Sequence, residues 1–282
     1  MMMWRMAQAL VLVVLVGVAR ANADPVQTKP SSQPASPQVT PATLPAANSI
    51  PAGVAAQAIQ RAADAKKYLF IFFYKAEDDA TKSARKTFEE ATSKLAEKPE
   101  AVVVNAGDRA ESDVVNRFGL GQAPMPLVLA IGPSGAVTQN FTQNFDEQQL
   151  RTAFVSPGTE KSLKALQDRK YVLLCVQNGE TQFNDQAMQG VRDFAADPQY
   201  ARSVEIVTVD PSDAREMDFL TRFGLSVSRK EAVTLLLAPP GKVMGTFVGA
   251  TDKNTLLVAA LPPKAGGCCG GGSDSGTCGT KK

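Results

Sequence analysis

The residues best able to do chemistry lie near the end of the sequence. Cys268, Cys269 and Cys278 occur in a glycine-rich tail that follows Pro262-Pro263. Thiolates bind soft metal ions such as Cu(I) or Zn(II), and exposed thiols exchange disulfides or link chains. An exported protein would readily join Cys278 to one of the adjacent pair. One thiol would then remain for a disulfide-linked oligomer. The spacing is not a recognised four-ligand zinc pattern, so disulfide, metal and thiol-exchange roles all stay open.

The composition removes several classes of function. The sequence contains no histidine, which excludes His-based catalytic triads, general bases and metal ligands from it. Lys and Arg number 30 against 28 Asp and Glu, with no basic block, so no nucleic-acid or anionic-membrane partner is indicated. The fourth cysteine, Cys175, lies in an apolar run and is expected to act as a small core hydrophobe.

A second candidate site follows the apolar, aromatic-rich run Tyr68–Tyr74. This run predicts a strand buried on both faces, as in a mostly parallel sheet. A helix is predicted to begin near Thr81, and the loop between the two contains Glu77, Asp78 and Asp79. Such acids can hold a hard divalent cation, or simply favour the positive N-terminus of the helix. The apolar face of that helix consists of Ala84, Phe88, Ala91 and Leu95.

The beginning of the sequence reads as an export signal. Arg5 supplies a positive charge, Ala7 to Val18 an apolar core, and Ala21-Asn22-Ala23 a small-residue cleavage site. The apolar run is too short to span a bilayer, so residues 1–23 are expected to be cleaved, with no membrane span left. Residues 24–51 are rich in proline and predict a disordered linker. We therefore expect a periplasmic, cell-envelope or secreted protein.

From residue 52 the periodicity predicts an αβαβαββα order, which then repeats. The first set covers residues 54–66, 68–74, 81–98, 101–105, 112–118, 127–131, 137–141 and 146–154, with Ser112 capping its third helix. The second set covers residues 160–168, 171–176, 185–196, 204–210, 214–223, 232–237, 243–247 and 252–261.

Internal matches support a duplication. Arg222–Leu225 repeats Arg117–Leu120 residue for residue at an offset of 105, and Lys170-Tyr171 matches Lys67-Tyr68 at an offset of 103. Offsets that drift slowly indicate two copies of one unit. The predicted domains are residues 52–155 and 156–262, followed by a disordered tail over 263–282.

This order, with a proline just before the third strand, resembles the thioredoxin family. The resemblance implies an α/β fold of two tandem thioredoxin-like domains, each a central mixed β-sheet flanked by helices. It places Met125-Pro126 where the family has its cis-proline, and Asp78 and Thr81 at its two cysteine positions. The second unit has Ala232 in place of that proline, and its loop 178–182 also contains no cysteine.

The missing cysteines set the functional expectation. Disulfide exchange needs a thiolate, and neither loop supplies one. We expect a redox-inactive binding or scaffold module rather than an enzyme, with no cofactor and with a protein or peptide partner bound in a groove around Pro126. The alternative is that the tail handles thiols or a soft metal (Cu or Zn), with the domains as a platform. A third reading is an envelope protein whose tail only cross-links.

Overall fold

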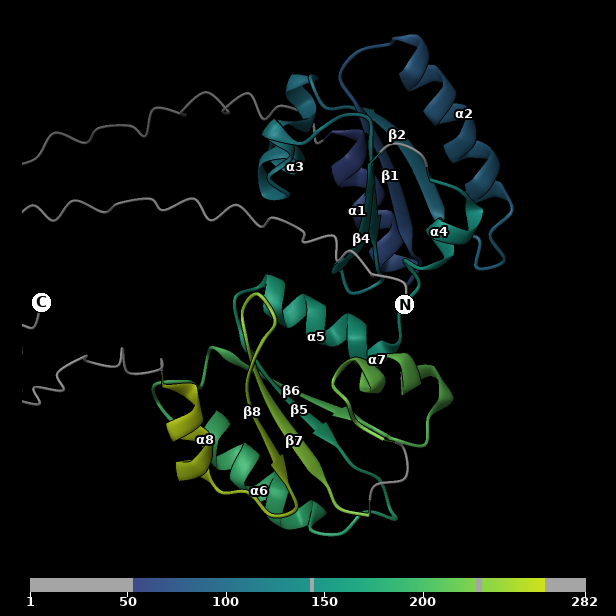
Figure 1. The fold of residues 1–282 in the computed structure, drawn as a ribbon. Helices are drawn as coiled ribbons and strands as arrows, with labels where there is room; N and C mark the ends of the chain where they lie inside the picture. Colours follow the sequence, from purple (N-terminus) through teal and green to yellow (C-terminus); the bar gives the residue numbers. More distant parts are fainter. Residues whose placement is uncertain (1–52, 143–144, 227–229, 262–282) are drawn as a thin grey trace, which may run out of the picture. The chain divides into compact units, whose positions relative to one another are not determined.

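A computed structural model describes residues 53–142, 145–226 and 230–261, and Figure 1 shows them as two sheets flanked by helices. The expected signal, the linker and the tail with Cys268, Cys269 and Cys278 lie outside the described residues. Within the described ranges, no helix is both long and apolar enough to cross a membrane.

The first repeat is built on one four-stranded sheet. Its order is β2-β1-β3-β4, with β1 parallel to β2 and antiparallel to β3, and with β3 antiparallel to β4. The sheet is therefore mixed, and the expectation of a mostly parallel sheet around β1 is wrong because the β3–β4 hairpin adds two antiparallel pairs. The elements are α1 (Val54–Asp64), β1 (Leu69–Tyr74), α2 (Asp79–Ser93), β2 (Glu100–Asn105), η1 (Arg109–Glu111), α3 (Ser112–Arg117), η2 (Leu120–Gln122), β3 (Leu127–Ile131), β4 (Val137–Thr142) and α4 (Glu147–Arg151).

The second repeat has the same connectivity. Its sheet order is β6-β5-β7-β8, again with one parallel and two antiparallel pairs. The predicted αβαβαββα order is thus confirmed in both copies. The elements are α5 (Pro157–Gln167), β5 (Tyr171–Val176), α6 (Asn184–Ala195), β6 (Val204–Val209), η3 (Ala214–Glu216), α7 (Met217–Arg222), β7 (Val233–Ala238), β8 (Lys242–Val248) and α8 (Lys253–Ala260).

The central strand β1 is buried on both faces, as its sequence predicted. Leu69 to Phe73 have no exposed surface. Because side chains alternate along a strand, Ile71 packs into a cluster with α1 and α3, whereas Phe72 packs into a cluster with α2 and α4. The two hydrophobic layers hold the helices on opposite faces of the sheet.

Some element boundaries differ from those predicted. Helix α2 begins at Asp79 and ends at Ser93, five residues before the predicted end at Lys98. Helix α5 begins at Pro157, three residues before the predicted start at Glu160. Proline suits the first helical position, and the Ser156 hydroxyl accepts a hydrogen bond from the Thr159 N–H, so this helix starts earlier than its apolar pattern suggests.

The predicted cap of α3 is wrong. Ser112 is already helical, and its helix is preceded by the 3₁₀ turn η1. The capping side chain lies upstream, where the Asp108 carboxylate accepts from the Ala110 N–H at 3.0 Å.

Candidate functional site

The loop between β1 and α2 places Asp78 at the N-cap of the helix. Its carboxylate accepts a hydrogen bond from the Thr81 N–H at 2.7 Å, and Thr81 is only 3% exposed. The Thr81 main chain and then its hydroxyl lower the pKa of Asp78, because both stabilise the carboxylate. The two residues predicted at the cysteine positions are therefore in contact, as a helix cap.

The neighbouring acids are also engaged. Glu77 forms an ion pair with Arg85 at 2.5 Å, and the Arg85 guanidinium lies 4.7 Å from the centre of the Tyr74 ring. Hydrogen bonding from Arg85 is the main cause that lowers the pKa of Glu77. Asp79 lies 3.5 Å from the Lys82 ammonium. Within the described ranges, no cluster of three or more His, Cys, Asp or Glu side chains is arranged to hold a metal ion.

The strand register brings Met125 and Pro126 to the same end of the sheet as this loop. Phe73, near the end of β1, pairs with Leu127 at the start of β3. The two connecting segments also touch, because the Lys75 ammonium donates to the Gly121 carbonyl at 2.9 Å. The Met125–Pro126 peptide bond is cis, as the resemblance implied.

Met125 has free main-chain groups. Its side chain is half-buried against the first-repeat core and Pro126 is buried. Among the described residues, neither the N–H nor the carbonyl of Met125 has a hydrogen-bond partner. A segment with unpaired main-chain groups at a sheet margin can hydrogen-bond an added extended chain.

The second repeat treats the corresponding position differently. The Gln182 N–H donates to the Lys230 carbonyl at 2.8 Å, and the Gln182 carbonyl accepts from the Ala232 N–H at 2.9 Å. Gln182 thus forms a parallel bridge with Glu231, the residue before the proline counterpart. In the second repeat, this loop therefore pairs with the residues on both sides of Glu231, the counterpart of Met125.

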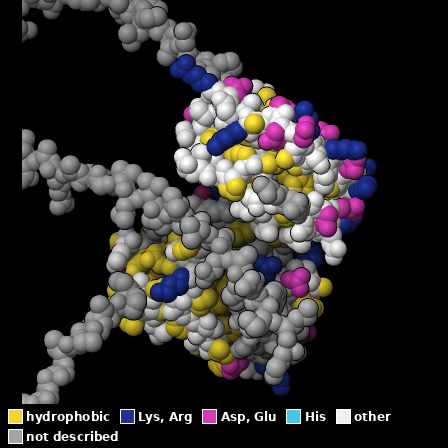
Figure 2. Space-filling view, turned by 45° about the horizontal axis from the view of Figure 1, so that its top comes forward, with side chains coloured by type: hydrophobic (Ala, Val, Ile, Leu, Met, Phe, Trp, Pro, Cys, Tyr) yellow, Lys and Arg dark blue, Asp and Glu magenta, His cyan; other side chains and the backbone are white. Residues whose placement is uncertain are grey.

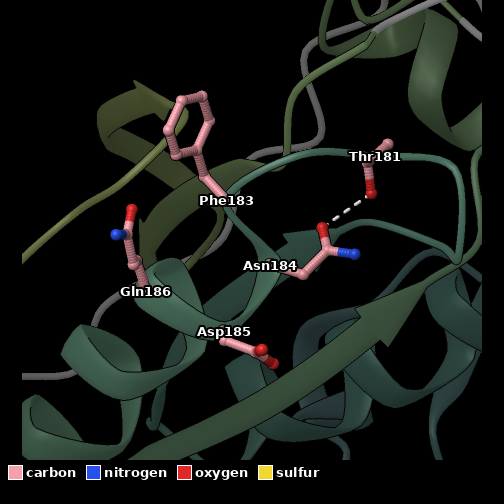
Figure 3. A pocket seen from close by; sticks show the side chains of 5 residues that line it. All are labelled: Thr181, Phe183, Asn184, Asp185 and Gln186. Carbon is pink, nitrogen blue, oxygen red and sulfur yellow. Dashed lines mark hydrogen bonds between the residues drawn. The ribbon is translucent and has the colours of Figure 1, made fainter.

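The Gln182 loop continues into a shallow hollow of about 440 Å³ at the start of α6 (Figure 3), lined by Thr181, Phe183, Asn184, Asp185 and Gln186. The Thr181 hydroxyl donates to the Asn184 side chain at 2.7 Å, the dashed line in Figure 3, and Asn184 in turn donates to the Asn178 carbonyl at 2.6 Å. Phe183 is 44% exposed and has a left-handed φ of 65°. These internal bonds close the loop on itself.

Cys175 occupies the buried position that its sequence context predicted. It is 2% exposed, and burial raises the pKa of its thiol to about 12. A thiol that is both neutral and shielded is a poor nucleophile.

Sequence reasoning missed two buried carboxylates that recur in the repeats. Glu111 accepts from the main-chain N–H of Val54 at 2.6 Å, and Glu216 accepts from that of Gly158 at 2.8 Å. Both are at most 5% exposed. The sequence contained a signal for this pair of glutamates. They are separated by 105 residues, the same offset as the repeated Arg-Phe-Gly-Leu motif.

The strand order, the parallel and antiparallel pairings and the helix on each face now define the architecture of both repeats. Each repeat has the thioredoxin fold. The sheets align strand for strand, with β1 and β5 at the centre and a β-hairpin at one margin.

Comparisons with known proteins add similarities of fold alone. No family model matches the chain, and no curated protein matches it. Among solved structures, the first two thioredoxin domains of Saccharomyces cerevisiae Eps1p are 12% identical, with a TM-score of 0.28, and cover 71% of this chain and 92% of that one. Zinc-bound human ERp44 is 11% identical, with a TM-score of 0.32, covering 73% and 60%. Arabidopsis thaliana thioredoxin O2 is 14% identical, with a TM-score of 0.28, covering 34% and 79%.

Proposed function

We propose that this chain is an exported, redox-inactive binding or scaffold protein whose first thioredoxin-like domain holds an extended segment of a partner protein at Met125-Pro126. The observation that carries this proposal is the pair of main-chain groups on Met125, which have no hydrogen-bond partner among the described residues.

The surroundings of Met125 suit a peptide rather than a thiol substrate. The two positions at the start of α2 carry a carboxylate and a buried hydroxyl, joined as a helix cap. Main-chain hydrogen bonds from Met125 would supply affinity, and the half-buried Met125 side chain offers an adaptable apolar contact. Lys75 and the Glu77–Arg85 pair provide charges of both signs at this end of the sheet.

The test replaces Met125 by lysine in the full chain. Fluorescent unstructured peptides of random sequence serve as the probe, and the pool that binds best is carried forward. We expect Met125→Lys to weaken binding about tenfold, a loss of ~1.4 kcal/mol. A charged side chain there loses the apolar contact and crowds the segment before β3.

The matched control is Glu231→Lys, at the corresponding position of the second domain. Because Gln182 already bridges that position, this variant should bind the same peptides as well as the parent. Equal losses in both variants, or no binding by the parent, would contradict the proposal.

The alternative function rests on the tail. Cys268, Cys269 and Cys278 remain candidates for soft-metal binding or disulfide exchange, with the two domains as a platform. This alternative predicts that metal binding or disulfide exchange is lost when the three tail cysteines are replaced. It also predicts that Met125→Lys leaves this activity unchanged.

A further inference from the structure

The two β-hairpins differ in how their outer edges are covered. At the edge of β4, the Val137 N–H donates to the Gln167 side-chain carbonyl at 2.9 Å, and the Gln167 amide donates back to the Val137 carbonyl at 2.7 Å. Both main-chain groups of Val137 that face away from β3 are thereby satisfied. Gln167, at the end of α5, acts like one residue of a neighbouring strand.

The counterpart edge on β8 has no such cover. Val243 pairs with Leu237 as Val137 pairs with Ile131, at the bulge of each hairpin. Within the described ranges, no side chain or main chain hydrogen-bonds the outer edge of β8. The Gly249 N–H donates to the Ala232 carbonyl at 2.8 Å, so the alternation of an antiparallel pair leaves the main chains of Val248 and Thr246 facing outward.

This uncovered edge is also apolar. Val243 is 44% and Val248 50% exposed, whereas no large hydrophobic residue of β2, β4 or β6 is similarly exposed in the described structure. The neighbouring α8 segment adds Val258 and Leu261, 71% and 56% exposed. Figure 2 shows hydrophobic side chains gathered on the second repeat, over the region of α8 and β8.

Natural sheet edges are commonly protected by charges, prolines or bulges. On β8 the only charged residue is Lys242, at the first position, and the bulge lies beside it. The stretch from Met244 to Val248 has neither protection. An uncharged edge strand of this kind is a template for another strand.

We propose that β8 pairs with β8 of a second copy of this chain, antiparallel about a two-fold axis. Antiparallel pairing of identical strands is self-complementary under two-fold symmetry. A pairing centred on Thr246 sets threonine opposite threonine, and it keeps the two Lys242 ammonium groups at opposite ends of the interface. In this register, Val248 of each copy lies opposite Met244 of the other, and Val243 lies opposite Gly249.

The course of the chain supports a second copy as the occupant. The described structure ends at Leu261, directly after α8, and α8 contacts β8. The sequence that contains Cys268, Cys269 and Cys278 therefore begins next to the proposed interface in each copy. Intermolecular disulfides would form between tails already brought together by the strands.

The test is the mass of the full chain by sedimentation equilibrium in a phosphine reductant, which removes any contribution of disulfides. We expect twice the monomer mass for the parent and the monomer mass for Val248→Lys. Thr142→Lys is the matched control, at the corresponding exposed position of β4, and should keep the parent's mass. Far-UV circular dichroism confirms that both variants are folded.

Hydrogen exchange supplies a measurement that needs no variant. The outward amides of Thr246 and Val248 should exchange slowly, and faster on dilution to concentrations where the mass is that of the monomer. A monomeric parent in reductant overturns the proposal, as does an equal effect of the two lysine variants. Protected amides in a monomer also overturn it, because another segment of the same chain would then cover β8.

Discussion

At the scale of single residues, two buried glutamates fix the start of each repeat. The carboxylate of Glu111 accepts from the N–H groups of Val54 and Ala55, the first residues of α1. The Glu216 carboxylate likewise accepts from the Gly158 N–H at the N-terminus of α5, and it also accepts from the Ser156 hydroxyl. The first N–H groups of a helix have no partner within the helix, so a buried carboxylate there replaces solvent.

We expect Glu111→Gln to lower the free energy of unfolding by about 1.5–3 kcal/mol, the usual contribution of hydrogen bonds to a charged group. The amide keeps the shape of the side chain but turns one acceptor into a donor, which then faces one of the two N–H groups. Urea unfolding measures the loss. Glu97→Gln, at an exposed position, is the control and should change stability by less than about 0.5 kcal/mol. A Glu111 variant as stable as this control would show that solvent satisfies α1 equally well.

At the scale of elements, the start of α2 corresponds to the position of the two cysteines in the thioredoxin family. In this chain, Asp78 caps the helix there. Asp78 has extended backbone angles (φ −77°, ψ 174°) and its carboxylate accepts from the N–H three residues later. Burial of Thr81 fixes this first turn against the core. Asp78 and Thr81 thus stabilise the start of this helix.

This cap should make stability depend on pH in a defined direction. Because the pKa of Asp78 is lowered in the folded state, its contribution is fully present above the ordinary aspartate pKa of about 3.9. It is lost as the pH falls through the lower folded value. We expect Asp78→Ala to unfold at lower urea than the parent at neutral pH, with the gap closing in acid.

Asp78→Asn separates charge from capping. The asparagine side chain still accepts from the Thr81 N–H but does not titrate. Its urea midpoint should lie near the parent's at neutral pH, and its difference from Asp78→Ala should persist in acid. A gap between parent and Asp78→Ala that is the same at both pH values would contradict the assigned role of the carboxylate.

At the scale of the whole molecule, the two thioredoxin-like domains differ in structure at corresponding positions. Among the described residues, the main chain of Met125 in the first has no hydrogen-bond partner, whereas in the second Gln182 pairs with the residues on both sides of Glu231. The hairpin edge of the first is capped by Gln167 from α5, whereas that of the second has no hydrogen-bonded cover within the described ranges. These differences underlie our proposals that the first domain holds a partner segment and that the second pairs with another chain.

The tail thiols can be tested without touching either domain. Cys268→Ser, Cys269→Ser and Cys278→Ser combined should abolish the reaction of the native chain with a thiol reagent at pH 8. The remaining Cys175 is buried, and its thiol pKa is raised to about 12. Unfolding in urea should expose one thiol per chain. Native reactivity in this variant would contradict the inert role of Cys175, and unchanged zinc or Cu(I) binding would exclude the tail as the metal site.

The sequence by itself determined the repeat, the order of elements, the buried central strand and the absence of thiols from both loops. These follow from residue type and periodicity over short distances, as in the run from Leu69 to Phe73. Helix ends were less predictable, because the start of α5 depends on a serine cap and a proline outside its apolar pattern.

Only the tertiary structure decided which main-chain groups are satisfied. Glu111 lies 57 residues from Val54, and Gln167 lies 30 residues from Val137. No local pattern specifies such partners, since each bond depends on how the folded backbone brings a side chain to a peptide group far away in sequence. The same holds for Gln182, whose pairing with residues 230–232 distinguishes the second domain from the first.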